Sequence, residues 1–304
     1  MKKFLSLVLA LTMMMSLVTI NAGAKEFTDD EELNYKEAVD VISEISVVDG
    51  YEDGSFKPQN TLTRGAAAKI ICNLILGPTT AAELHADTAP YKDVPVSNTF
   101  SGYIAYCAKE KIISGYADGS FRPAGTLTGY AFMKMLLGAL GYDATYEGYT
   151  GGNWSINVAK QAIGIGLNKG LVDEFNGVDF VTREEAALYA FNTLKATMVD
   201  YDQKITTNVN GVDVTISQGN AKPVTWTEGI NEDGNIKDDD FVQFAEEFFP
   251  KLVRKDDNDK FMAPANTWVY DKSEIGTYER TDLIVGTYTT QVTGKDAYDL
   301  LKSG

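Results

Sequence analysis

Two short stretches of the sequence repeat one set of polar and aromatic side chains. Residues 50–58 read GYEDGSFKP and residues 115–123 read GYADGSFRP, so the second stretch follows the first at an offset of 65 residues. Each stretch carries a tyrosine, a serine and a cation, and Arg64 follows the first one. Arginine can donate two parallel hydrogen bonds to a carboxylate, and loop amides, Asp and Ser can bond hydroxyl groups. This chemistry is suited to binding an acidic, hydroxyl-bearing ligand.

Much of the repeated stretch also has a structural explanation. An Asp-Gly pair is typical of a tight turn whose glycine has a positive φ. Phe56 and its counterpart Phe121 are expected to pin each loop to the core, and a proline stiffens each loop exit. The polar groups left to project are therefore the candidate contacts, namely Tyr51, Ser55, Lys57, Arg64, Tyr116, Ser120 and Arg122.

Residues for catalysis or metal binding are scarce. His85 is the only histidine, so a His-based metal site or catalytic triad would have to be built almost without His. The two cysteines, Cys72 and Cys107, are too few for a disulfide scaffold. Each lies among apolar neighbours in a helical pattern, which favours two buried thiols over a bridge between them. We expect no cofactor.

The first residues indicate export. Lys2 and Lys3 precede an apolar run, and Ala22-Gly23-Ala24 supplies the small residues of a cleavage site, so we predict a signal peptide. A membrane anchor is the alternative, but no charged stop follows the run. The net charge of −16 becomes −18 without the two lysines, which disfavours nucleic acid as a partner. No later stretch is long and apolar enough to be a transmembrane segment after cleavage.

The repeated loops lie inside a repeated helix–loop–helix unit. In the first unit, a helix over residues 34–46 precedes the loop, and a second helix starts behind Thr63 and ends at Gly77. In the second unit, a helix over residues 101–112 precedes the loop, and Thr128 takes the place of Thr63. A third, degraded copy has a helix over residues 154–167. Its second helix starts at a capping box formed by Thr182 and Glu185.

These three units behind a signal peptide resemble the S-layer homology (SLH) domain. The resemblance covers residues 33–198 and is specific in the first two units and weak in the third. It implies an α-helical pseudo-threefold bundle, followed by a smaller mixed α/β or β-rich C-terminal segment. The implied division is a signal peptide (1–24), repeat 1 (25–80), repeat 2 (88–143), degenerate repeat 3 (150–200) and a C-terminal region (201–304) belonging to a larger protein.

The resemblance also implies a function. Modules of this kind hold secreted proteins non-covalently on Gram-positive walls by binding secondary cell-wall polysaccharide, often pyruvylated, in grooves between repeats. The chain is then expected to be associated with peptidoglycan and to assemble as a surface-layer subunit. A helix N-terminus beside Arg64 or Arg183 would add partial positive charge for an anionic polymer.

The family's Thr-Arg-Ala-Glu motif locates the groove arginines. It appears as TRGA at 63–66, TGYA at 128–131 and TREE at 182–185. The groove arginine therefore maps to Arg64 and Arg183, whereas Gly129 replaces it in repeat 2, where we expect Arg122 to compensate. The full set of expected glycan contacts is Tyr51, Asp53, Gly54, Ser55, Lys57, Arg64, Tyr116, Asp118, Gly119, Ser120, Arg122, Arg183 and Glu184.

Three alternatives remain. Asn231, Asp233 and Asp240 match EF-hand calcium positions, but position one is Gly229, so we favour a solvated acidic turn. A carbohydrate-active enzyme held on the wall could use paired carboxylates such as Glu246 and Glu247, although their helix is flanked by aromatic residues. The repeats could also form a helical array that binds a protein partner.

The C-terminal region has its own local patterns. Alternating residues around Asn210-Gly211 predict a β-hairpin. Residues 238–253 are expected to form one amphipathic helix, residues 266–279 and 282–292 strands, and residues 294–304 the start of a helix.

Overall fold

The fold is described from a computed structural model. It covers residues 23–201, 205–209, 212–216, 219–226, 235–283 and 293–303. The predicted signal peptide therefore lies outside the described residues except for its last two positions. The turn predicted at Asn210-Gly211 and most of the strand predicted over 282–292 also lie outside them.

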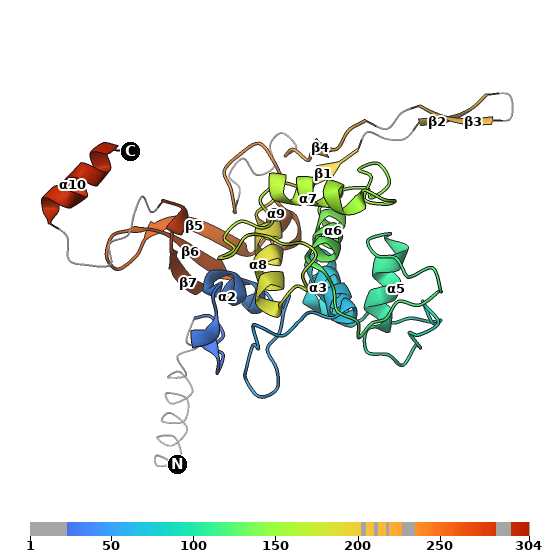
Figure 1. The fold of residues 1–304 in the computed structure, drawn as a ribbon, viewed down its shortest axis with the longest axis horizontal. Helices are drawn as coiled ribbons and strands as arrows, with labels where there is room; N and C mark the ends of the chain where they lie inside the picture. Colours follow the sequence, from blue (N-terminus) through green and yellow to red (C-terminus); the bar gives the residue numbers. More distant parts are fainter. Residues whose placement is uncertain are drawn as a thin grey trace, which may run out of the picture.

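Helices make up the first two thirds of the described chain, and strands follow (Figure 1). The helical elements are η1 (Asp30–Glu32), α2 (Lys36–Glu44), α3 (Arg64–Leu76), α4 (Pro78–Ala82), α5 (Ser101–Lys109), α6 (Gly129–Ala139), α7 (Trp154–Gly164), α8 (Arg183–Leu194), α9 (Phe244–Phe248), η2 (Thr281–Leu283) and α10 (Gly294–Ser303). The strands are β1 (Val199–Asp200), β2 (Ile205–Val209), β3 (Val212–Ile216), β4 (Lys222–Pro223), β5 (Leu252–Asn258), β6 (Pro264–Tyr270) and β7 (Ser273–Glu279).

The three predicted helix starts are confirmed. The hydroxyl of Thr63 accepts the N–H of the third residue of α3 at 3.2 Å, and Thr128 does the same for α6 at 3.4 Å. At α8, Thr182 and Glu185 form the full capping box, with distances of 3.2 and 2.7 Å. Gly77, with φ of 73°, ends α3 as expected, but the short helix α4 follows directly and was not predicted.

Extended segments just before these three helices are joined in a closed ring. The N–H of Leu62 donates to the carbonyl of Val181 (2.8 Å), that of Val181 to Leu127 (3.0 Å), and that of Leu127 to Leu62 (3.2 Å). All three side chains are buried. The ring therefore links the starts of α3, α6 and α8 at one point of the core.

The helical core holds the predicted anchors. Phe56 and Phe121 are fully buried, which confirms that each loop is pinned from inside. Phe56 packs against Phe27 with ring centroids 5.2 Å apart. Cys72 and Cys107 are buried and unbridged, as expected, with their sulfur atoms 3.5 Å apart.

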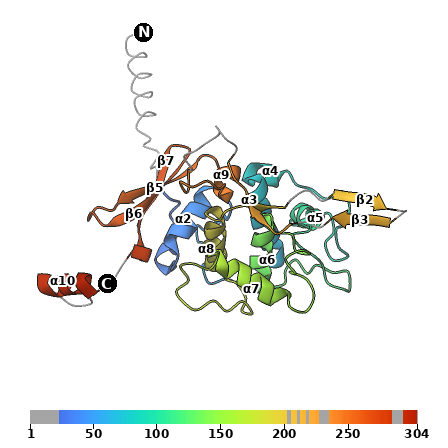
Figure 2. The ribbon, with the colours of Figure 1, turned by 90° about the horizontal axis from the view of Figure 1, so that it is seen from above.

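The C-terminal region packs against these helices on one side. Strands β5, β6 and β7 form an antiparallel sheet in sequence order, and a tight turn at Asp271 and Lys272, both with positive φ, joins the last two. Trp268 of this sheet stacks edge-on against Phe191 of α8 at 5.2 Å, and Tyr278 bonds the carboxylate of Asp40 at 2.6 Å. The antiparallel pair β2–β3 extends from the opposite end of the molecule in both views (Figures 1 and 2).

Two predicted elements are wrong. Instead of a helix over residues 238–253, only α9 is helical, because an extended segment precedes it and the sheet follows it. Phe241 and Gln243 form bridges to Thr225 and Thr197, which hold the start of the segment extended. The strand predicted over residues 266–279 forms two strands, most of β6 and all of β7, separated by the turn at Asp271 and Lys272. The described start of the strand predicted over 282–292 is wrong, because it lies in η2. The helix from residue 294 is confirmed, so the fold class is mixed helix and sheet.

Candidate functional site

Two grooves between repeats each combine an arginine, a tyrosine and a lysine. Groove 1 has a volume of about 450 Å³ and groove 2 about 380 Å³. The tyrosine and lysine come from the loop and second helix of one repeat, and the arginine comes from the second helix of another. The sets are Arg183, Tyr51 and Lys69 in groove 1 and Arg64, Tyr116 and Lys134 in groove 2.

The arginine of groove 1 is anchored on the loop that it crosses. Arg183 donates from Nε to the carbonyl of Phe56 and from Nη2 to that of Asp49, both at 2.9 Å. Its guanidinium carbon lies 4.6 Å from the ring centroid of Tyr51, a cation–π distance. These bonds leave Nη1 without a partner among the described residues, so the side chain keeps donors for a ligand.

Arg64 repeats this arrangement in groove 2. It donates from Nε to the carbonyl of Phe121 at 2.8 Å and from Nη2 to that of Ser114 at 3.1 Å. Its guanidinium carbon lies 5.1 Å from the ring centroid of Tyr116. Burial lowers the pKa of Arg64 and of Arg183 from its ordinary value, but an arginine side chain stays charged at neutral pH.

The tyrosines and the loop cations lie beside these arginines. Tyr51 and Tyr116 are 41% and 42% exposed, so part of each ring faces the groove opening. Lys57 lies 4.3 Å from the centroid of Tyr51, and Arg122 lies 4.1 Å from that of Tyr116. Each ring is therefore in contact with two cations, and only the remainder of its surface is free for a sugar.

In the loop of repeat 1, the predicted Asp, Gly and Ser form the turn itself. Asp53 Oδ1 accepts the backbone N–H of Ser55 at 3.1 Å and also its hydroxyl, and Gly54 has φ of 81°. The ammonium of Lys57, 2.8 Å from Asp53, and the groups of Ser55 hold the pKa of Asp53 well below its usual range. Ser55 is buried, so its polar atoms serve the turn.

The loop of repeat 2 has the same internal bonds. Asp118 Oδ1 accepts the backbone N–H of Ser120 at 2.9 Å and its hydroxyl at 2.6 Å, and these bonds hold the pKa of Asp118 well below its usual range. Gly119 has φ of 80°, and Arg122 pairs with Asp118 at 3.4 Å. Of the predicted loop residues, the tyrosines therefore line the grooves, Lys57 and Arg122 contact the tyrosine rings without lining the grooves, and Asp, Gly and Ser remain in the turns.

Two carboxylates that sequence reasoning missed hold these loops in place. Asp29 accepts the backbone N–H groups of Phe56 and Lys57, each at 2.7 Å. Asp93 accepts those of Phe121 and Arg122, also at 2.7 Å. The second residue of each pair, Lys57 and Arg122, has a positive φ, 55° and 60° respectively. Such a φ is strained for a residue other than glycine. The signal that could have found the aspartates is their near-equal spacing from the two loops.

Lys69 and Lys134 were also missed. They are separated by the same offset as the loops and lie on equivalent turns of α3 and α6. Lys69 is 3.6 Å from Asp49, and Lys134 lies 5.7 Å from the ring centroid of Trp154. Burial lowers the pKa of Lys134.

The first N–H groups of α3 and α8 are already hydrogen-bonded within the protein, so the partial positive charge that we expect at these helix ends is all that they offer a ligand. The first two N–H groups of α3 donate to the carbonyls of Gly125 (2.9 Å) and Pro123 (2.8 Å) in the loop of repeat 2. Those of α8 donate to Asn60 (2.8 Å) and Pro58 (3.1 Å) in the loop of repeat 1. Since the threonine caps take the third N–H, these groups are satisfied within the protein.

A third cavity at the start of α6 differs in character. It has a volume of about 150 Å³, and among the described residues that line it there is no lysine or arginine. Tyr130 and Phe175 fill the corresponding space with ring centroids 5.8 Å apart, and a Cβ on Gly177 would lie 2.1 Å from Tyr130 Cε1. Arg122, which we expected to compensate for Gly129, does not line this cavity, and it lies with Arg64 over the ring of Tyr116. The carboxylates that line the cavity are Asp173, Glu174, Asp179 and Glu185.

The remaining predictions are the glycan contact Glu184 and the EF-hand-like calcium site. Glu184 is buried and accepts hydrogen bonds from Asn34 (2.9 Å) and Gln59 (2.6 Å), so we leave it out of the contact set. Asn231 and Asp233 of the EF-hand-like segment are not described, and Asp240 is exposed. Within the described residues, no three His, Cys, Asp or Glu side chains are placed to hold a metal ion.

Comparison with known proteins identifies a domain family in this chain. Residues 26–68 and 90–129 match the family model of the S-layer homology domain, so the chain carries this domain in two segments. In the described part of the chain, no helix combines the length and hydrophobicity needed to cross a bilayer. The chain is a secreted cell-surface protein of the Gram-positive type.

Similar proteins come from bacterial surfaces. The surface layer protein of Brevibacillus choshinensis is 25% identical over 188 residues, 61% of this chain and 17% of that protein. An uncharacterized cell wall amidase of Bacillus anthracis is 28% identical over 153 residues, 48% of this chain and 28% of that protein. The cellulosome-anchoring protein of Acetivibrio thermocellus is 28% identical over 134 residues, 41% of this chain and 30% of that protein. The chain thus matches less than a third of the length of each of these relatives.

Proposed function

We propose that grooves 1 and 2 anchor the protein to the cell wall by binding an acidic secondary cell-wall polysaccharide. The S-layer homology domain and the relatives from cell surfaces support the anchoring of a surface protein. The main support for polysaccharide binding is the repeated set of arginine, tyrosine and lysine in two grooves of similar volume.

The chemistry of each groove suits a sugar that carries a carboxylate. The free donors of the arginine can bond a carboxylate such as that of a pyruvyl ketal, and the lysine adds a second cation at the groove wall. The half-exposed tyrosine offers a ring edge and a hydroxyl to the sugar itself. A chain with a net charge of −16 can thus hold an anionic polymer through a few local cations.

The arrangement of the repeats belongs to the same proposal. The closed ring at Leu62, Leu127 and Val181 supports a pseudo-threefold bundle in which each second helix starts against the loop of another repeat. In this bundle two grooves carry arginine, and the third is closed by aromatic packing. Two sites on one chain would raise the retention on a long repeating polymer by avidity.

The similarity to a surface layer protein also supports a role as a subunit of a surface layer. In that role the repeats hold the chain beside the peptidoglycan, and the remaining protein is available for self-assembly. The relative named as an amidase makes a wall-anchored enzyme the alternative, which zymography on cell walls would detect.

Cosedimentation with purified Gram-positive cell walls tests the anchor. The chain should pellet with intact walls and stay in solution with walls stripped of their polysaccharide. Lys134→Met should reduce the pelleted fraction several-fold, because it removes a groove cation that makes no hydrogen bond or ion pair among the described residues. Lys109→Met removes the same charge from an exposed position on α5 and should pellet like the wild type. Equal pelleting on stripped walls would contradict the proposal and favour peptidoglycan or a protein partner.

A further inference from the structure

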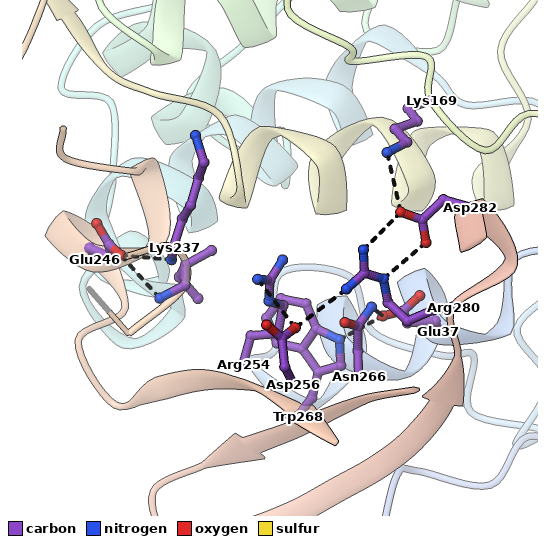
Figure 3. Close-up of polar contacts among 11 residues, drawn as sticks. Glu37, Lys169, Lys237, Glu246, Arg254, Asp256, Asn266, Trp268, Arg280 and Asp282 are labelled. Carbon is purple, nitrogen blue, oxygen red and sulfur yellow. Dashed lines mark hydrogen bonds and ion pairs between the residues drawn. The ribbon is translucent and has the colours of Figure 1, made fainter. Parts of the chain in front are cut away.

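Another cavity in the described part of the chain lies away from both grooves. It has a volume of about 670 Å³, within the range of small-molecule sites, and lies between α2, the end of α8 and the three-stranded sheet. We call it the junction cavity. Figure 3 shows that Arg254 and Arg280 point from the sheet side toward α8, and that Lys169 approaches from the helical side.

The junction cavity is locally basic in an acidic protein. Its lining includes five basic and three acidic residues, whereas the whole chain has a net charge of −16. Asp282 is occupied by Arg280 at 2.9 Å and by Lys169 at 3.9 Å. Glu37 accepts the indole N–H of Trp268 at 2.7 Å and the amide of Asn266 at 3.3 Å. Both oxygens of Asp282 are therefore paired, whereas Glu37 accepts these bonds through Oε1.

Lys195 is a cation of the junction cavity that takes part in none of these pairs. It caps the C-terminal end of α8, and its ammonium lies 3.8 Å from the ring centroid of Phe191. Its ammonium makes no ion pair and no hydrogen bond among the described residues, although the side chain is partly buried. Burial lowers its pKa to about 8. Arg254 and Lys169 act in the same direction, and Glu37 and Asp282 oppose it.

The sheet adds unsatisfied polar atoms beside this lysine. Nε of Arg254 and Oδ1 of Asn266 are buried and have no hydrogen-bond partner in the described structure. The guanidinium of Arg254 has only a long contact, 3.7 Å, with Asp256. Buried polar atoms without partners are uncommon and costly, and at a cavity wall they indicate a ligand.

We propose that the junction cavity binds a small oxyanion-bearing ligand, a phosphate or carboxylate on a hydroxylated group, through Lys195 and Arg254. An oxyanion would neutralise the lysine and give the guanidinium a planar acceptor. Asn266 and Glu37 lie on the same wall, where their oxygens can accept bonds from hydroxyl groups. The proposal is independent of the wall anchor, since no arginine or tyrosine of grooves 1 and 2 lines this cavity.

Thermal unfolding of the full chain, titrated with inorganic phosphate in one arm and acetate in the other, tests this site. Both arms are run at pH 7 and at an ionic strength held constant with chloride. A saturable rise of the unfolding midpoint in either arm is expected for the wild type, and the arm that responds identifies the oxyanion. Lys195→Met should weaken the apparent affinity at least tenfold, and Lys109→Met should leave it unchanged.

A second readout separates loss of binding from loss of folding. Because Lys195 is an uncompensated charge, Lys195→Met should unfold at a higher temperature than the wild type in chloride alone at pH 7. The unfolding temperature of the wild type should approach that of the variant as the pH rises from about 8 toward 10.5, the ordinary pKa of lysine in the unfolded chain. Over this range the folded protein has already lost the proton of the Lys195 ammonium, so the cost of burying the charge disappears. No saturable shift in the wild type, or an equal shift in Lys195→Met, would overturn the proposal.

Discussion

At the scale of single residues, the loops beside the grooves depend on two aspartates that lie outside the grooves. Lys57 and Arg122 lie beside the tyrosines, and the backbone of each adopts a positive φ. Asp29 and Asp93 stabilise that backbone by accepting two N–H groups each. The loop cations that contact the groove tyrosines are thus held by carboxylates outside the grooves.

Replacing one of these carboxylates should destabilise its loop. Asp93→Asn removes one of the two acceptors, and hydrogen bonds to a charged group contribute about 1.5–3 kcal/mol, so the free energy of unfolding should fall by roughly 1–3 kcal/mol. Urea unfolding at pH 7 measures this loss of unfolding free energy. Asp87→Asn, which lies at an exposed position in the linker, is the matched control.

The difference in unfolding free energy between the wild type and Asp93→Asn should depend on pH in one direction. The backbone N–H groups of Phe121 and Arg122 hold the pKa of Asp93 below its ordinary value. Its contribution is therefore complete above pH of about 4 and is lost as the pH falls through the lower folded-state pKa. The gap between wild type and Asp93→Asn should narrow in acid, and a gap that widens there would refute this role.

At the scale of elements, local signals located the helices well. The starts of α3, α6 and α8 follow from a threonine and the residues just after it, and all three were predicted. Between residues 238 and 253, partners distant in the sequence override the helical pattern. Likewise, the contents of the third cavity could not be predicted, because Gly177 and Tyr130 meet only when two repeats pack.

The capping box of α8 should make a measurable contribution. Thr182→Ala removes the acceptor for the N–H of Glu185, and such a loss lowers the free energy of unfolding by about 0.5–2 kcal/mol. Thr182→Ser keeps the hydroxyl and should retain most of the stability in chemical denaturation. Equal losses in both variants would show that the methyl group, and not the cap, matters.

At the scale of the whole molecule, three cavities where repeats or regions meet are lined by cations, and the third cavity at the start of α6 is not. Grooves 1 and 2 lie between repeats, and the junction cavity lies between the repeats and the sheet. The sequence predicted both groove arginines from their motif. The junction cavity was not predictable, because its walls come from α2, α8 and strands more than 200 residues beyond α2.

Calorimetric titration with a single repeat unit of a pyruvylated wall polysaccharide tests the central claim most directly, because a monovalent ligand counts sites without avidity. We predict two sites on the wild type and one on either Arg64→Lys or Arg183→Lys, since lysine keeps the charge but loses the planar pair of donors. The double variant should bind at least tenfold more weakly. Because each arginine also donates two hydrogen bonds to loop carbonyls, every variant is titrated well below its own unfolding midpoint. Unchanged stoichiometry in the double variant, or no binding to the wild type, would contradict the account.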